Sequence, residues 1–155
     1  MMQGVLYISH GSRVPEATKE AAACISAVVE EVDVPLQQVC FLELAEPTIE
    51  QGVGILVSQG ATRIAIVPVL LLSAGHYYKD IPREIERIQQ LYPSIAFTYG
   101  HTLGVQDRII DVLVERIEET NTPITNDAKI ILVGRGSNYP QTKMDLEAIR
   151  GKLQT

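Results

Sequence analysis

Segments that look like buried strands alternate with helical patterns along almost the whole chain. Such alternation is typical of βαβ units, which build a mostly parallel sheet with helices on both faces. The pattern therefore predicts an α/β fold, a three-layer sandwich around a mostly parallel sheet. In sheets of this kind, ligands bind at the carboxyl ends of the strands. The predicted strands are the apolar, β-branched runs at residues 4–9, 36–44, 63–71, 94–99 and 129–134.

The segments between these runs carry helix signals of two kinds. Pro15 and Pro47 are well placed for the first turn of a helix. Residues 80–92 place apolar side chains three and four positions apart, which indicates one buried helical face. The predicted helices cover residues 15–32, 47–60, 80–92, 105–119 and 140–153.

The chain starts the same pattern a second time near its end. Residues 119–128 are rich in Thr, Asn and Pro, which is typical of a boundary. A strand-like run, a Gly-Ser turn and a helical segment follow, as they do after residue 4. We therefore expect a domain at residues 1–120 that carries the active site. Residues 121–155 are then a linker plus the first strand and helix of a second repeat.

The charge and composition exclude some classes of function. The chain has 155 residues and a net charge of −6, which argues against a general nucleic-acid binder. An anionic ligand would need a local cluster of Arg or Lys. The longest apolar stretch, residues 64–72, is too short to span a bilayer, and the start of the chain has no export signal. We expect a cytoplasmic protein, with no membrane partner, in which Cys24 and Cys40 are reduced and buried.

Each of the three histidines follows an apolar run. His10, His76 and His101 should therefore lie at the edge of the sheet where ligands bind. The alternative for any one of them is a partly buried histidine that hydrogen-bonds a loop. Three histidines in equivalent places favour a shared chemical role.

Glu43 interrupts an apolar run near its end. A carboxylate in such a run must be paired, bound to a cation or close to the edge of the sheet, because burying a bare charge is costly. Neutral imidazoles and a carboxylate suit a first-row divalent metal. They can also accept protons near neutral pH. The alternative is that Glu43 caps a loop or pairs with an arginine.

Two further segments have features of a ligand site. Gly11 and Ser12 lie between a strand and a helix start, where free backbone N–H groups can bind anions. Tyr77 offers a flat face next to Tyr78, and Lys79 and Arg83 offer positive charge at helical spacing. These residues fit a flat, aromatic, polyanionic ligand. The alternative is a solvated helix start with two interfacial tyrosines.

Three of these segments together resemble the class II chelatases. They are "LYISHGSR" at 6–13, "FLELAEPTI" at 41–49 and "VPVLLLSAGHYYKDIPREI" at 67–85. Within that family the chain is most similar to the sirohydrochlorin ferrochelatases and cobaltochelatases, and above all to the siroheme-pathway enzymes of the Bacillus type. The likeness covers the N-terminal half of such an enzyme plus the start of its second half.

The resemblance implies a fold of two similar α/β halves, made by one long chain or by two short chains. It implies insertion of Fe²⁺ or Co²⁺ into sirohydrochlorin, in siroheme or cobalamin biosynthesis, with no permanently bound cofactor. In the long members the second half lacks the metal-site histidines, which fits Arg135 in the place of His10. A homodimer or a domain-swapped dimer is then an expected assembly.

The resemblance also implies roles for individual residues. His10, Glu43 and His76 are expected to be the catalytic and metal-binding residues. Which of them ligates the metal and which accepts protons stays open. The expected substrate-binding residues are Ser12, Arg13, Tyr77, Lys79 and Arg83.

Three other functions compete with this hypothesis. A carrier would bind the metal or the tetrapyrrole with the same residues and insert nothing. A histidine phosphatase has an arginine directly before its His-Gly turn, and Ser9 stands there in this chain. A half-domain would be active only within a complete chain.

Overall fold

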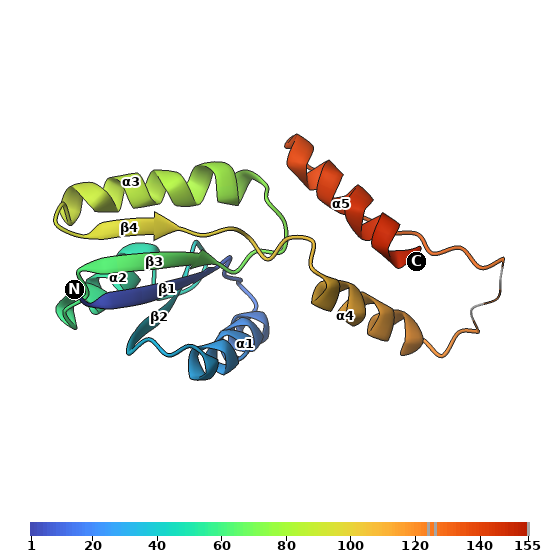
Figure 1. The fold of residues 1–155 in the computed structure, drawn as a ribbon, viewed down its shortest axis with the longest axis horizontal. Coiled ribbons are helices and arrows are strands. Elements are labelled where there is room, and N and C mark those ends of the chain that lie inside the picture. The colour runs from blue at the N-terminus through green and yellow to red at the C-terminus, as the bar shows by residue number, and fades with distance from the viewer. Residues whose placement is uncertain (124, 126, 155) are drawn as a thin grey trace.

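The computed structural model describes residues 1–123, 125 and 127–154, and its centre is a four-stranded sheet. The strands follow the order β2-β1-β3-β4, and every pair is parallel (Figure 1). This confirms the predicted parallel α/β architecture. The strands are β1 (Gln3–Ser9), β2 (Leu36–Phe41), β3 (Arg63–Pro68) and β4 (Ala96–Tyr99).

Helices connect the strands in the order that the sequence predicts. They are α1 (Pro15–Glu31), α2 (Ile49–Ser58), the π-helical turn η1 (His76–Asp80), α3 (Ile81–Leu91), α4 (Asp107–Glu118) and α5 (Pro140–Leu153). The helix α2 begins with a capping box, in which Thr48 accepts from the N–H of Gln51 and the Gln51 side chain accepts from the N–H of Thr48. Among the described residues, no helix combines the length and the hydrophobicity that crossing a membrane requires.

Two hydrophobic cores, one on each face of the sheet, make the three layers. Successive side chains of a strand point to opposite faces. Leu6 and Ile8 therefore join the core beneath α2 and α3, whereas Val5 and Tyr7 pack with Ile25 of α1 on the other face. The predicted sandwich is confirmed by this division.

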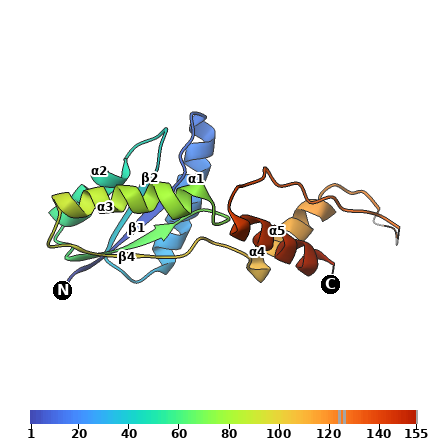
Figure 2. The ribbon, with the colours of Figure 1, turned by 90° about the horizontal axis from the view of Figure 1, so that it is seen from above.

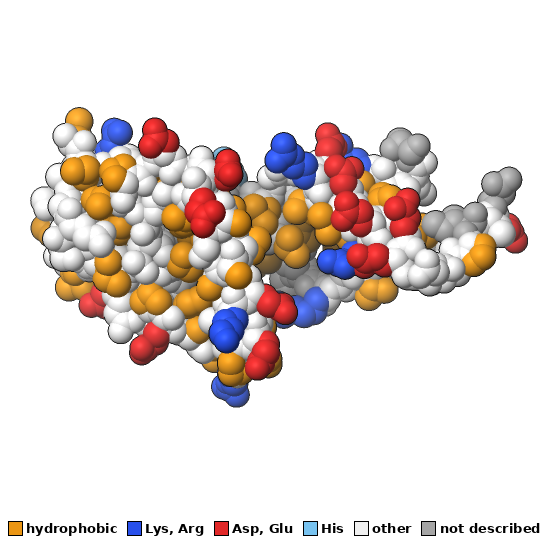
Figure 3. Space-filling model, turned by 90° about the horizontal axis from the view of Figure 1, so that it is seen from below, with side chains coloured by type: hydrophobic (Ala, Val, Ile, Leu, Met, Phe, Trp, Pro, Cys, Tyr) orange, Lys and Arg blue, Asp and Glu red, His pale blue; other side chains and the backbone are white. Residues whose placement is uncertain are grey.

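The helices α4 and α5 lie beyond the carboxyl ends of the strands and pack against each other (Figures 1 and 2). The start of α5 contacts the segment that follows β3. The hydroxyl of Thr142 donates to the carbonyl oxygen of Ser73 at 2.9 Å, and the ring of Tyr139 stacks on that of Tyr78 with centroids 5.3 Å apart. Figure 3 shows hydrophobic side chains in the hollow between the two parts of the molecule.

The predicted fifth strand is wrong. Residues 129–134 form no strand, and the side chains of Ile131 and Val133 are 82% and 83% exposed. A strand needs a neighbour that pairs with its N–H and C=O groups, and within the described part of the chain no strand lies beside it. The predicted linker includes residues 124 and 126, and the predicted last unit ends at residue 155; these three positions lie outside the described residues.

The prediction for the cysteines holds for only one of them. Both are free thiols, and Cys40 on β2 is buried, but Cys24 on α1 is exposed. Ile25 is the side chain that α1 buries, and its neighbour Cys24 points about 100° away from it around the helix, so the thiol stays exposed. Burial raises the pKa of the Cys40 thiol far above its ordinary value.

Two loops at the carboxyl edge of the sheet touch at Gly11. Hydrogen bonds continue past the ends of β1 and β2, from the N–H of Leu42 to the carbonyl of Ser9 at 2.9 Å and from that of Glu43 to the carbonyl of His10 at 3.1 Å. Gly11 has a φ of +91°, and a Cβ on it would lie 1.8 Å from the carbonyl oxygen of Glu43. Only glycine allows this close approach.

Gly11→Ala should therefore destabilise the fold more than Gly60→Ala does. Both glycines have a positive φ, but a Cβ on Gly60 meets nothing within 4 Å. Gly60→Ala should cost about 1–2 kcal/mol in the free energy of unfolding, the cost of a left-handed residue. Gly11→Ala should cost at least about twice as much, because the clash forces two backbone segments apart. Urea unfolding measures both, and equal losses would contradict the close contact at Gly11.

The two cysteines should differ in their reaction with a thiol reagent. One thiol per native chain, that of Cys24, should react quickly, because only a thiolate that the reagent can reach attacks. Cys40 should react only after denaturation, when both of the cysteines in the sequence become labelled. Labelling of native Cys24→Ser at the wild-type rate would show that Cys40 is accessible after all.

Candidate metal centre

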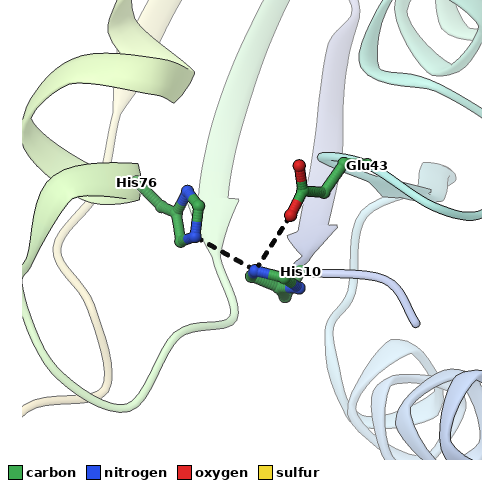
Figure 4. Close-up of side chains that lie close together, drawn as sticks. All are labelled: His10, Glu43 and His76. Carbon is green, nitrogen blue, oxygen red and sulfur yellow. Dashed lines mark hydrogen bonds and ion pairs between the residues drawn. The ribbon is translucent and has the colours of Figure 1, made fainter. Parts of the chain in front are cut away.

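Three of the predicted residues come together at the carboxyl edge of the sheet. His10 follows β1, Glu43 follows β2, and His76 is the first residue of η1, which follows β3. Figure 4 shows their side chains pointing toward one another. One nitrogen or oxygen atom from each lies within 4.8 Å of the others. We call these three residues the candidate centre.

The imidazoles of the candidate centre face each other through the same ring atom. His10 Nε2 lies 3.0 Å from His76 Nε2 and 3.4 Å from Glu43 Oε1. The opposite nitrogen, Nδ1, is hydrogen-bonded on both rings. His10 Nδ1 lies 2.9 Å from the carbonyl oxygen of Gly11, and His76 Nδ1 lies 2.8 Å from Asp80 Oδ2.

These partners indicate that Nδ1 of each ring carries a proton. A carbonyl or carboxylate oxygen only accepts a hydrogen bond, so Nδ1 carries the proton on both His10 and His76. Each neutral ring would then present a lone pair at Nε2, and the hydrogen bond between the two Nε2 atoms places one proton there for a metal to displace. Two lone pairs and the carboxylate of Glu43 converge on one small volume, and such a set of donors binds a cation.

The spacing suits a first-row metal ion. Two nitrogen ligands about 2.1 Å from one metal stand about 3 Å apart when their bonds are at right angles. The Nε2 atoms of His10 and His76 are 3.0 Å apart. Imidazole and carboxylate ligands together accept Fe²⁺, Co²⁺ and their neighbours in the series, so the ligand set fits the metals named in the sequence hypothesis.

The candidate centre is open to solvent. The side chains of His10, Glu43 and His76 are 42%, 50% and 34% exposed. Structural metal sites are usually closed by four protein ligands, whereas reactive sites keep a coordination position open. Three partly exposed ligands therefore leave coordination positions of the metal free for a further ligand to bind or leave.

His76 is held by an unusual turn. In η1 the N–H of Ile81 donates to the carbonyl of His76, five residues earlier in the chain. Pro82 has no N–H to offer the next carbonyl, that of Tyr77. The hydroxyl of Tyr99 donates to this carbonyl instead, at 2.9 Å. Burial raises the pKa of Tyr99, and the nearby Tyr77 adds to this, so the phenol keeps the proton that it donates.

The hydrogen bonds described for the predicted substrate-binding residues do not reach the candidate centre. Arg13, Lys79 and Arg83 are exposed. The hydroxyl of Ser12 accepts from the N–H of Val14 at 3.0 Å. The contacts of Tyr77 are described below.

Tyr77 links the remaining histidine to this region. Its ring stacks on Tyr99 with centroids 5.1 Å apart, and its hydroxyl lies 3.2 Å from His101 Nδ1. His101 was expected at the same edge of the sheet, but it is not among the residues of the candidate centre. Its described partner is the side chain of Tyr77 on η1, and His101 itself is exposed, so it also differs from the alternative of a partly buried histidine that hydrogen-bonds a loop.

Sequence reasoning missed Asp80. Its carboxylate binds His76 from one helical turn away, and the spacing of four residues between the two was the available signal. A cavity of about 550 Å³ has His76 and Asp80 on one side. On its other side lies the second Gly-Ser turn, residues 134–138, which includes Arg135. The two turns that the sequence repeats therefore lie near the same site.

The relatives of this chain are enzymes of tetrapyrrole metallation. It is 53% identical to the sirohydrochlorin ferrochelatase of Priestia megaterium, over 99% of this chain and 58% of that protein. It is 32% identical to the sirohydrochlorin cobaltochelatase of Saccharolobus solfataricus, over 77% of this chain and 96% of that shorter protein. The structure of SirB from Bacillus subtilis with Fe³⁺ matches with a TM-score of 0.92 and 44% identity, over 99% of this chain and 61% of SirB.

The chain thus spans about three fifths of the length of its long relatives and nearly all of a short one. The profile of the CbiX family matches residues 4–120, which hold all four strands and the three residues of the candidate centre. This chain belongs to the CbiX family.

Proposed function

We propose that this chain inserts Fe²⁺ or Co²⁺ into sirohydrochlorin. The observation that carries the proposal is the convergence of the Nε2 atoms of His10 and His76 and a carboxylate oxygen of Glu43. The names of the relatives support the substrate, and SirB with Fe³⁺ supports a metal in this fold. The metal is a substrate here and leaves with the product.

The first step is capture of the metal by the candidate centre. Once the proton between the two Nε2 atoms has left, these atoms and the Glu43 carboxylate replace some of the water ligands of the ion. Because the three side chains are between 34% and 50% exposed, the remaining positions face outward. The tetrapyrrole approaches from that side, and its nitrogens take over the ion one by one.

The transfer must also account for two protons. A divalent metal replaces the two pyrrole N–H protons of sirohydrochlorin, so two protons must leave for each ion inserted. When the metal departs, it frees the lone pairs of His10 and His76. A freed imidazole, or the Glu43 carboxylate, can accept a pyrrole proton near neutral pH. The same three residues therefore serve as ligands before the transfer and as bases during it.

The carboxylates of the substrate need positive partners, since the chain has a net charge of −6. Arg13 is exposed just after the first Gly-Ser turn. Lys79 and Arg83 are exposed on η1 and at the start of α3, next to His76 in the chain. We propose that they bind substrate carboxylates, with Ser12 beside Arg13 and the ring of Tyr77 against the macrocycle.

We also propose two units, residues 1–120 with the candidate centre and residues 121–155 with the start of a second repeat. The match of the CbiX family profile to residues 4–120 supports this division. The exposed apolar residues at 130–133 then need a partner segment, from a second copy or from more chain. A homodimer or a domain-swapped dimer would supply it.

The activity is tested by mixing the chain with sirohydrochlorin and Co²⁺ or Fe²⁺ without oxygen and following the absorbance of the macrocycle. Insertion should exceed the rate of the protein-free blank. His10→Ala and His76→Ala should each lower the rate by about 10²–10⁴-fold, the range for loss of a positioned acid or base. His101→Ala is the matched control and should keep most of the rate. Binding of Co²⁺ without insertion would favour a carrier instead.

Removing positive charge near His76 should weaken substrate binding more than it slows the chemical step. Lys79→Gln and Arg83→Gln should each raise KM for sirohydrochlorin by up to about fivefold, because an exposed ion pair contributes about 0.2–1 kcal/mol. The increase should shrink in high salt, which screens exposed charges. Arg63→Gln, at the opposite edge of the sheet, removes the same charge and should leave KM unchanged. An equal rise in all three variants would point to net charge alone.

A further inference from the structure

We propose that Asp80 is a positioning residue that sets the tautomer of His76 and thereby aims its Nε2 lone pair into the candidate centre. This inference rests on the proposed metal-binding role of His76. It concerns a residue outside the ligand set, one that the sequence hypothesis did not include.

His76 and Asp80 are joined by a direct hydrogen bond, in which only the histidine can be the donor. His76 Nδ1 lies 2.8 Å from Asp80 Oδ2, four residues later in the chain. An ionised carboxylate only accepts hydrogen bonds, so the ring donates and keeps its proton on Nδ1. The π-helical turn η1 begins with one of these residues and ends with the other, which keeps them on the same side of the turn.

Capping of α3 does not account for the position of Asp80. Aspartate directly before a helix usually accepts a hydrogen bond from a backbone N–H of the first turn. Asp80 stands at that place before α3, yet its side chain makes no such bond. Its backbone is already helical, with φ −75° and ψ −47°, because η1 runs on into α3. The hydrogen bond described for its carboxylate is the one to His76.

The two histidines differ in how their tautomers are secured. The Nδ1 proton of His10 goes to the backbone carbonyl of Gly11, which no side-chain substitution can remove. The Nδ1 proton of His76 goes to the side chain of Asp80. In water a neutral imidazole prefers its proton on Nε2. Without Asp80, His76 would therefore turn an N–H toward His10 and lose the lone pair that the metal needs.

Such a partner should change metal affinity by a measurable factor. Residues that hold a ligating histidine by its other nitrogen are worth about 10- to 100-fold in metal affinity or activity. Asp80→Ala should weaken Co²⁺ binding by this factor. Asp80→Asn should lose less, because its amide oxygen can still accept the Nδ1 proton. Glu86→Gln, which removes one negative charge on α3, should bind Co²⁺ like the wild type.

The experiment combines Co²⁺ titration of the whole chain with ¹⁵N NMR of its histidines in the metal-free state. The NMR spectrum of the wild type should show the proton of His76 on Nδ1, and Asp80→Ala should shift it toward Nε2. In a double-mutant cycle, Asp80→Ala should have almost no further effect on Co²⁺ affinity once His76 is alanine. Urea unfolding of each variant confirms that it is folded; if Asp80→Ala is not, the cycle is run with Asp80→Asn.

The results separate the two proposals. If His76→Ala binds Co²⁺ like the wild type, the candidate centre itself fails. If His76→Ala weakens binding and Asp80→Ala does not, or if their losses simply add, Asp80 does not act through His76 and the inference is overturned. An unchanged Nδ1 proton on His76 in Asp80→Ala would also overturn it.

Discussion

The parallel pairing of β1 with both β2 and β3 is the constraint on which the candidate centre depends. The central strand brings its carboxyl end between the ends of its two neighbours, so residues far apart in the sequence share one edge. His10, Glu43 and His76 each lie just past one of these strands. The contact at Gly11, which admits no Cβ, holds the first two loops together. The third loop is set by η1 and by the hydroxyl of Tyr99.

Local patterns were enough to predict four strands of the sheet and its helices, and to mark three histidines and Glu43 as candidates, but the choice of His10, Glu43 and His76 came from the resemblance to the chelatases. Strand and helix periods are properties of short segments, and the rule for parallel sheets then places the histidines at one edge. The failures depend on neighbours that a local pattern does not contain. Residues 129–134 have the composition of a strand but no described strand to pair with, and Cys24 is exposed although its neighbour Ile25 is buried. The role of Asp80 needed the direction of one hydrogen bond, which no pattern of residue types gives.

The second Gly-Ser turn lies close to the candidate centre, but it carries an arginine where the first turn carries a histidine. Residues 134–138 face His76 and Asp80 across a shared cavity, and the Tyr139–Tyr78 stack and the bond from Thr142 to Ser73 hold them there. Arg135 stands where the first turn has His10. An arginine cannot give up its proton at ordinary pH, so it is unsuited to ligate a metal but well suited to bind a carboxylate. The repeat thus places a candidate metal ligand in one turn and a side chain suited to bind anions in the other.

A carrier and a chelatase need the same ligands but different surroundings. Each must hold an ion loosely enough to release it, and three half-exposed ligands suit that task in both cases. A chelatase must in addition hold the macrocycle over the ion while two protons leave. Residues 134–138, which line the same cavity as His76, therefore form the wall of the site whose structure distinguishes a chelatase from a carrier. In this chain that wall includes Arg135, on a segment whose neighbouring apolar residues at 130–133 are exposed. A partner that covers those residues would also fix the wall in place, so assembly and insertion should depend on the same surface.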